Sequence, residues 1–506
     1  MSAHGQTTFT WTGSGTDNNL GTAGNWSTSA PINDGTSTLS FDDSALTFTP
    51  FLETDYDVSS LQFVNSTNSY AFDAAPGTTL TLESGGMMGD PGVATFSSNI
   101  GINVAQNQEW DIWSSSNFTV SGVISGTGSL VLNSDNTGSL RLDSSNTNSG
   151  GTTVQGGLTV LLNADDALGT GPLTIADSTL SALSAVTLDN STTITSSFSV
   201  QNSAPLTLSG PVTLAVSPTI TVNGDASGPL IISGDVGESG GSQSATVTGG
   251  GTLQLSGNNS YSGGTTILGA TVLASSNSAL GTGTVALGNS DQPGTLAVDS
   301  GVTLTNVLVL TKGTLGGVGT FGPDSTPVIG SNLTVAPGFT KVIGGVTSGT
   351  IGTLTFSTGL ELAGGGTISL KFKDPNGVAG SGWDLVSVSG GTLNLTATSG
   401  SPITLTLSSY DSETSAAGLL GGFNPNSNYQ WQIAGAANIS GFDSTAFTFD
   451  TSLFHDGSLS PSQFSVSLSG NSLFLNFAPV PEPSTLALLA LGAATLAGAG
   501  LRRRRR

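Results

Sequence analysis

Short hydrophobic runs that alternate with polar residues recur along most of the chain. Between residues 252 and 287, four such runs occupy 253–255, 265–268, 271–273 and 284–287, separated by turn sequences such as Ser-Gly-Asn-Asn, Ser-Gly-Gly and Gly-Thr-Gly. Alternation with a period of two, in segments rich in Val, Ile, Leu and Thr, predicts short β-strands, and no convincing helical periodicity lies between them. The pattern therefore predicts an all-β protein, built either as a sandwich or as a solenoid.

Two parts of the chain repeat each other. Ser149–Val154 reads SGGTTV and Ser262–Ile267 reads SGGTTI, while ALGTG occurs both at 167–171 and at 279–283. The first pair is offset by 113 residues and the second by 112, so the register is almost constant. Repetition favours the solenoid, because each coil can bury its inward Val, Leu and Ile side chains on the neighbouring coils.

The composition narrows the class further. Among 506 residues there are 72 Gly, no Cys and 8% charged residues, whereas soluble domains usually contain about 25% charged residues. The missing Cys excludes disulfides and thiolate metal sites, and a hydrophobic content of 36% argues against disorder. We therefore expect a folded chain whose surface is covered by Ser, Thr, Asn and Gly.

The charge is distributed unevenly. Five of the ten Lys and Arg residues form the terminal run 502–506, so residues 1–501 carry five basic residues against 33 acidic ones. A body this acidic repels phosphate backbones. We expect no nucleic acid partner.

The C-terminus has three parts in a fixed order. Residues 480–484 read VPEPS, residues 486–501 form an uncharged stretch, and five Arg follow. As a helix the uncharged stretch would rise about 24 Å, somewhat short of a hydrocarbon core of ~30 Å. We expect a membrane span whose arginines stay in the cytoplasm. The residues assigned to the span are Leu486, Leu488, Leu489, Leu491, Leu496 and Leu501, and those assigned to the cytoplasmic anchor are Arg502, Arg503, Arg504, Arg505 and Arg506.

This order of parts resembles the PEP-CTERM sorting signal, with Pro481, Glu482 and Pro483 as its motif. The resemblance covers about residues 479–506. It implies recognition by an exosortase-type sorting protease, removal of the tail, and delivery to the surface or extracellular matrix of a Gram-negative bacterium. Residues 1–7 lack the positive and apolar regions of a signal peptide. We interpret this as a trimmed or misassigned start, with export by another route as the alternative.

A second resemblance concerns the repeats. Residues 251–266 read GTLQLSGNNSYSGGTT, which is similar to the autotransporter-associated β-strand repeat, whereas the copy at 138–153 has Asn148 in the place of Tyr261. The resemblance covers about residues 100–290. It implies a right-handed parallel β-helix outside the cell, and it implies no enzymatic activity.

These patterns divide the chain into four expected parts. Residues 1–100 form a β-rich N-terminal cap, 101–320 a β-solenoid with two repeats, 321–477 a Phe-rich C-terminal β-domain, and 478–506 the sorting tail with one short hydrophobic helix. Caps are expected because the ends of a solenoid otherwise expose core residues and edge strands.

Candidate catalytic groups are few. His455 stands alone beside Asp456, and the letters of a nucleophile elbow at 237–241 precede no helical pattern. The carboxylate pairs at 42–43 and 165–166 are adjacent along the chain, so on a strand they point to opposite faces and do not suit glycoside cleavage. We expect no catalytic residue, no cofactor and no metal.

The sequence therefore predicts an exported, non-catalytic protein of the cell surface or extracellular matrix. Its outward Ser, Thr and Asn suit hydrogen bonding to extracellular polysaccharide, and its other partners are the sorting protease and, through the tail, the membrane. Two alternatives stay open. One is a β-helix polysaccharide lyase or glycosidase, although 121–290 holds a single basic residue, Arg141. The other is a passenger that associates only with itself through edge strands.

Processing of the tail is directly measurable. If the sorting motif is used, the protein recovered from its native host lacks roughly the last 25 residues, which comprise the apolar span and its flanks. Intact mass spectrometry reports this loss together with the true N-terminus. A mass that still includes the Arg run would contradict removal of the tail.

Overall fold

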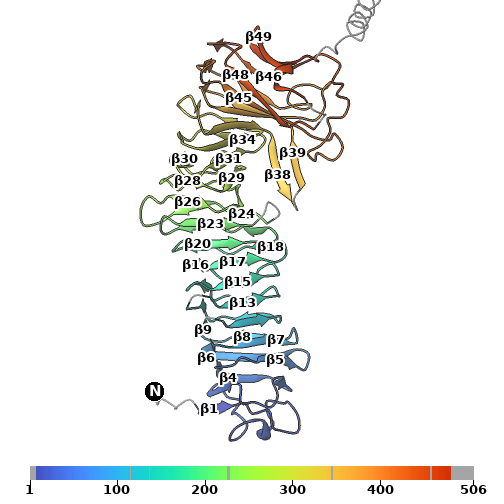
Figure 1. The fold of residues 1–506 in the computed structure, drawn as a ribbon. Helices are drawn as coiled ribbons and strands as arrows, with labels where there is room; N and C mark the ends of the chain where they lie inside the picture. The colour runs from blue at the N-terminus through green and yellow to red at the C-terminus, as the bar shows by residue number, and fades with distance from the viewer. Residues whose placement is uncertain are drawn as a thin grey trace, which may run out of the picture.

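The chain forms an elongated stack of short β-strands (Figure 1). The helical elements of the described part are two single 3₁₀ turns, η1 (Ala23–Asn25) and η2 (Pro461–Gln463). The expected all-β solenoid is thereby confirmed, whereas the predicted C-terminal helix lies outside the described residues. This computed structural model describes residues 7–113, 115–135, 137–224, 228–343, 346–455 and 459–479, without the side chains of 339–349.

Three long parallel sheets form the faces of the stack. In order of pairing, the first sheet contains β1 (Thr7–Thr10), β2 (Ser37–Phe41), β4 (Tyr56–Val64), β6 (Thr78–Asp90), β9 (Gln108–Ile112), β12 (Leu130–Asn133), β14 (Thr152–Val154), β16 (Leu173–Ile175), β19 (Thr192–Ile194), β22 (Val212–Leu214) and β25 (Val236–Glu238), with β8 (Ile100–Val104) and β11 (Ile124–Gly126) branching from β6. The second sheet contains β3 (Phe51–Leu52), β5 (Ser69–Ala74), β7 (Val93–Phe96), β10 (Asn117–Val120), β13 (Ser139–Leu142), β15 (Thr159–Leu162), β17 (Thr179–Ala182), β20 (Phe198–Gln201), β23 (Thr219–Asn223), β26 (Ala245–Thr248), β28 (Thr265–Leu268), β30 (Val285–Leu287) and β33 (Leu308–Leu310). The third sheet contains β18 (Val186–Leu188), β21 (Leu206–Leu208), β24 (Leu230–Ile232), β27 (Thr252–Leu255), β29 (Thr271–Ala274), β31 (Gly294–Val298), β34 (Gly313–Gly317), β37 (Leu333–Pro337), β42 (Thr367–Phe372), β45 (Ile403–Ser409) and β48 (Phe447–Leu453).

Two further sheets take the places of the first and second sheets in the chain order of the C-terminal coils. The fourth sheet contains β32 (Thr303–Leu304), β35 (Thr320–Phe321), β40 (Thr353–Phe356), β43 (Leu385–Val388), β46 (Tyr429–Ala436), β50 (Ser472–Phe477) and β49 (Phe464–Ser469). The fifth contains β36 (Val328–Ile329), β41 (Leu360–Leu362), β44 (Leu393–Leu395) and β47 (Ile439–Ser440). Only the last pairings, β46–β50 and β49–β50, turn antiparallel within these sheets. Apart from them, β38 (Phe339–Ile343) and β39 (Val346–Thr350) form an antiparallel hairpin, drawn in yellow in Figure 1.

The coils form because alternate residues of each strand point inward. In β22, Val212 and Leu214 are buried while Thr213 between them is half-buried. Burying apolar surface on the coils above and below drives the stacking, and parallel pairing satisfies the backbone of every inner strand. One continuous core results, which runs from Phe9 to Phe477.

Aromatic side chains concentrate at the two ends of this core. Near the N-terminus Trp11 and Trp26 meet edge to face with ring centroids 5.2 Å apart, and Phe41 packs on Phe63 at 5.2 Å. Near the C-terminus Phe423 contacts Phe454, Phe477 and Trp431, among other rings. These large rings supply much of the apolar area that is buried at the two ends.

Parallel strand pairing continues without a break across the two domain boundaries that were expected at residues 100 and 320. Strand β6 pairs with β8 across residue 100, and β34 pairs with β37 across residue 320. The division at these positions, and the start of the tail at 478, stay predictions about composition and function. The strands on either side belong to the same ladders.

The two sequence repeats have the same local structure on different faces. In the first copy β13 and β15 lie in the second sheet, whereas their equivalents β27 and β29 lie in the third sheet. The strands between the two copies therefore do not complete a whole number of coils. As a result, each strand of the second copy lies one sheet farther around the stack than its equivalent in the first copy. The two copies therefore share the local shape of a coil but face different sides of the rod.

Each repeat contains a buried Asn that joins three consecutive coils. Asn259 accepts a hydrogen bond from the N–H of Val236 at 2.8 Å and donates one to the carbonyl of Ala279 at 2.5 Å. Asn146 does the same between Ile124 and Ala167. In both copies a loop replaces one strand of the coil, so the amide side chain supplies the hydrogen bonds that the strand would have made.

We expect Asn259→Ala to destabilise the protein by about 1–3 kcal/mol, because it leaves a buried N–H and a buried carbonyl unsatisfied. Urea unfolding followed by circular dichroism measures the change. The neighbouring exposed Asn258 provides the matched control, and Asn258→Ala should change the free energy of unfolding by less than about 0.5 kcal/mol. Equal effects of the two substitutions would contradict the role assigned to Asn259.

Candidate functional site

The residues of the predicted sorting tail lie outside the described residues. They comprise Pro481, Glu482 and Pro483, the six leucines of the span, and Arg502 to Arg506. Their individual roles stay predictions. Within the described ranges no helix is long and apolar enough to span a bilayer.

The remaining candidates from the sequence have local structural partners. His455 is exposed, and its backbone N–H donates to the hydroxyl of Ser409 at 2.7 Å. Glu238 of the elbow-like segment accepts hydrogen bonds from Gln243 and Ser262, and a turn at 240–241 follows it instead of a helix. The described residues contain no group of three His, Cys, Asp or Glu side chains able to hold a metal ion.

One carboxylate of each adjacent acidic pair, Asp43 and Asp165, accepts hydrogen bonds from nearby residues. Asp43 accepts hydrogen bonds from the hydroxyl and N–H of Thr67 and from the N–H of Asn68, which lower the pKa of Asp43 to about 2. Asp165 accepts from the N–H of Thr187 at 2.7 Å. Asp43, held ionised by these hydrogen bonds, braces a turn and is poorly suited to donate a proton at neutral pH.

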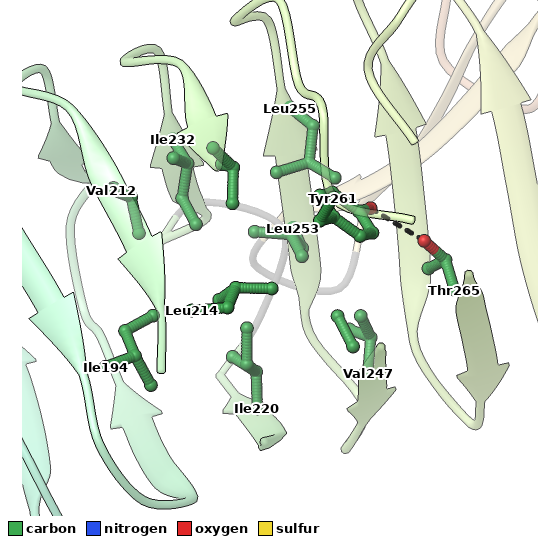
Figure 2. A pocket seen from close by; sticks show the side chains of 12 residues that line it. Ile194, Val212, Leu214, Ile220, Ile232, Val247, Leu253, Leu255, Tyr261 and Thr265 are labelled. Atoms are coloured by element: carbon green, nitrogen blue, oxygen red, sulfur yellow. Dashed lines mark hydrogen bonds between the residues drawn. The ribbon is translucent and has the colours of Figure 1, made fainter. Parts of the chain in front are cut away.

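An enclosed apolar cavity lies inside the stack at the level of the second repeat (Figure 2). Its volume is about 20 Å³, and Leu214, Ile220 and Leu253 are among the side chains that line it. Tyr261 reaches Thr265 from one side with its hydroxyl 2.7 Å from that of Thr265, and burial raises the pKa of Tyr261 to about 12. A space this small holds one water at most, so it is a packing imperfection of the core.

The same geometry explains the difference between the two copies of the repeat. Asn148 takes the position of Tyr261 and donates to the hydroxyl of Thr152 at 3.2 Å. Both side chains are buried, and both bond to the threonine four residues later. The departure from the repeat pattern therefore preserves the contact.

The outer faces of the stack carry threonines in register. On the third sheet Thr271, Thr295, Thr314 and Thr334 occupy the same position of four consecutive strands, and we call them the third-sheet ladder. The column also includes further threonines on both sides, which are Thr252, Thr367, Thr404 and Thr448. Regular pairing spaces these hydroxyls ~4.8 Å apart.

The first sheet carries a comparable column. Thr153, Thr174, Thr193 and Thr213 are in register on consecutive strands, and we call them the first-sheet ladder. All eight threonines of the two ladders are half-buried. The two ladders therefore present the same chemistry on different sides of the rod.

A groove distinguishes the third-sheet ladder. It has a volume of about 280 Å³ and is lined by the four threonines of that ladder together with small residues, among them Gly316 and Ala336. At one end it reaches Gly338, where the chain leaves β37 to enter the β38–β39 hairpin. Figure 1 shows this hairpin projecting along the rod toward its N-terminal end.

A buried ion pair fixes both ends of the hairpin. Lys371 and Asp384 are 2.8 Å apart, and their side chains are 3% and 0% exposed. The ammonium group of Lys371 also donates to the carbonyl of Pro337, just before the hairpin, while Asp384 accepts from the N–H of Gly352, just after it. The hairpin is thus clamped at its base to the outer face of the third sheet.

Burial is the largest influence on the charge of this clamp. It raises the pKa of Asp384 to about 6, whereas the Lys371 ammonium and the N–H groups of Gly352 and Lys371 favour the ionised carboxylate. The pair was not predicted from the sequence, because the two residues are 13 positions apart and Lys371 has the charged neighbours Lys373 and Asp374 much closer along the chain. In β42 the residues Thr367, Ser369 and Lys371 share the outward face of the strand. This alternation was the one signal in the sequence that placed Lys371 on the outer face of the sheet.

Comparison with known families supports both resemblances. A family model described as passenger-associated-transport-repeat matches residues 137–162 and 246–274, which include the two loops held by Asn146 and Asn259. A model described as PEP-CTERM protein-sorting motif matches residues 479–506. No curated protein matches the chain.

These matches establish where the protein acts. The sorting motif indicates export to the cell envelope, anchoring in the membrane through the C-terminal segment, and processing by an exosortase. The passenger-type repeats and the solenoid agree with an exported surface protein. The localisation expected from the sequence is confirmed.

Asp384→Asn should destabilise the protein by about 3–5 kcal/mol, because it leaves the Lys371 ammonium buried without a counter-charge. The double substitution Lys371→Met with Asp384→Leu should recover most of that loss, since it removes both charges together. Arg141→Met is the control, because the Arg141–Asp143 pair is 42% exposed at the arginine, and its loss should cost about 1 kcal/mol or less. Urea unfolding measures all three, and a double variant no more stable than Asp384→Asn would contradict the clamp.

Proposed function

We propose that the exported protein is a non-catalytic structural or adhesive component of the cell surface, and that it binds extracellular polysaccharide through its polar faces. The observation that carries the proposal is the register of threonines on the outer faces, such as the third-sheet ladder. A threonine hydroxyl both donates and accepts hydrogen bonds, and so do the hydroxyls of a sugar. A row of such groups suits a polymer better than a small molecule.

The alternative function, a lyase or glycosidase, has one region in its favour. Asp34 and Glu83 line a hollow of about 380 Å³ near the N-terminal end, and both lie close enough to Asp57 to act on its charge. Burial, followed by the charges of Glu83 and Asp34, raises the pKa of Asp57, as a general acid requires. The hollow's described lining contains no Lys or Arg, and the region lacks the basic side chain that a lyase needs to stabilise a carboxylate substrate.

Incubation of the full chain, purified in a mild detergent, with neutral and anionic matrix glycans separates the two functions. We expect co-sedimentation with glycan and no new reducing ends or unsaturated products. Release of such products by the wild type, abolished by Asp57→Asn, would show an enzyme and overturn the proposal. Absence of binding to every glycan would overturn it as well.

A further inference from the structure

We propose that the groove along the third-sheet ladder is the polysaccharide-binding site, and that it takes an extended chain of uncharged sugars lying along the rod. The inference rests on the proposed function and assigns it to one face. Its basis is the joint occurrence of a hydroxyl ladder, a floor of small residues, an uncharged lining and a clamped hairpin at one end.

The hydroxyls of the ladder are available to a ligand. Among the described residues, no hydrogen bond joins the side-chain oxygens of Thr271, Thr295, Thr314 or Thr334 to another protein group, whereas farther along the column the hydroxyls of Thr404 and Thr448 pair with each other at 3.3 Å. Each free hydroxyl can donate one hydrogen bond and accept others. Four of them in register offer repeated contacts to a repeating polymer, and such contacts add through effective concentration.

Small residues beside the ladder form the floor of the groove. Ala297, Gly316 and Ala336 occupy the outward position two residues after the threonines on β31, β34 and β37. Ala297 and Gly316 are themselves buried, so the accessible floor is narrow. A ligand in the groove would therefore meet chiefly the threonine hydroxyls.

Charge selects the kind of polymer. The described lining of the groove contains no charged side chain, and the Lys371 and Asp384 side chains beside its Gly338 end neutralise each other as an ion pair. The chain as a whole carries a net charge of −23. An anionic polysaccharide would be repelled by the acidic body of the protein, so the site favours a neutral one.

The hairpin matches the ladder in length. Five residues of β38 span about 17 Å, and the distance from Thr334 to Thr271 over three strand spacings is about 14 Å. The groove begins at Gly338, at the base of the hairpin, and follows the ladder from there. The base of the hairpin therefore marks one end of the groove.

The test compares two variants that each lose four hydroxyls. The groove variant carries Thr271→Val, Thr295→Val, Thr314→Val and Thr334→Val, and the control variant carries Thr153→Val, Thr174→Val, Thr193→Val and Thr213→Val in the first-sheet ladder. Val keeps the β-branched shape, so both variants should retain the fold, which circular dichroism checks. Binding of a soluble neutral hexaglucan and of an oligogalacturonate to the full chain in mild detergent is measured by calorimetry.

We expect the wild type and the control variant to bind the neutral glucan alike, and the groove variant to bind it at least ~10-fold more weakly. Equal binding by all three would place the site elsewhere and overturn this inference while leaving the proposed function intact. Preference for the oligogalacturonate would overturn the neutral ligand class. Failure of the wild type to bind the neutral glucan would overturn the inference, whereas the proposed function falls only if the protein binds no matrix glycan at all.

Discussion

The structure depends on the register between neighbouring parallel strands. Each coil lies on the next so that Val212 covers Thr192 and Leu214 covers Ile194, and the same alignment continues along the rod. This register aligns the side chains on both faces of each sheet. Inside it builds the continuous apolar core, and outside it turns scattered Thr residues into straight ladders. The polar surface is therefore ordered as strictly as the interior.

The scarcity of charge follows from the same constraint. In a parallel stack, side chains at equivalent positions of adjacent strands lie about 4.8 Å apart, and like charges at that distance repel each other. Thr and Ser avoid this cost and keep the preference for extended backbone. The few charged groups that remain are used locally, as Asp43 braces a turn and Lys371 with Asp384 clamps the hairpin. A surface of this kind suits a protein that acts outside the cell by many weak contacts.

The sequence was sufficient for the fold class, the repeats and the envelope localisation. Alternation in 253–255 and 265–268 is a local signal, and so is the SGGTT loop that the buried Asn259 holds in place. The face of the stack on which each repeat lies could not be predicted from the sequence, because it depends on how many strands separate the two copies. The β38–β39 hairpin and the groove were missed for a similar reason, since an alternating strand pattern does not say whether a strand joins the stack or leaves it.

Pulsed electron spin resonance on a doubly labelled chain tests the central claim of register most directly. The protein has no Cys, and Ser139 and Thr248 are joined by five consecutive registered pairings of the second sheet although 109 residues separate them in sequence. With Ser139→Cys and Thr248→Cys as label sites, the account predicts one narrow distance distribution, with backbones ~24 Å apart. A broad distribution, or one centred far beyond this distance, would contradict a continuous parallel stack.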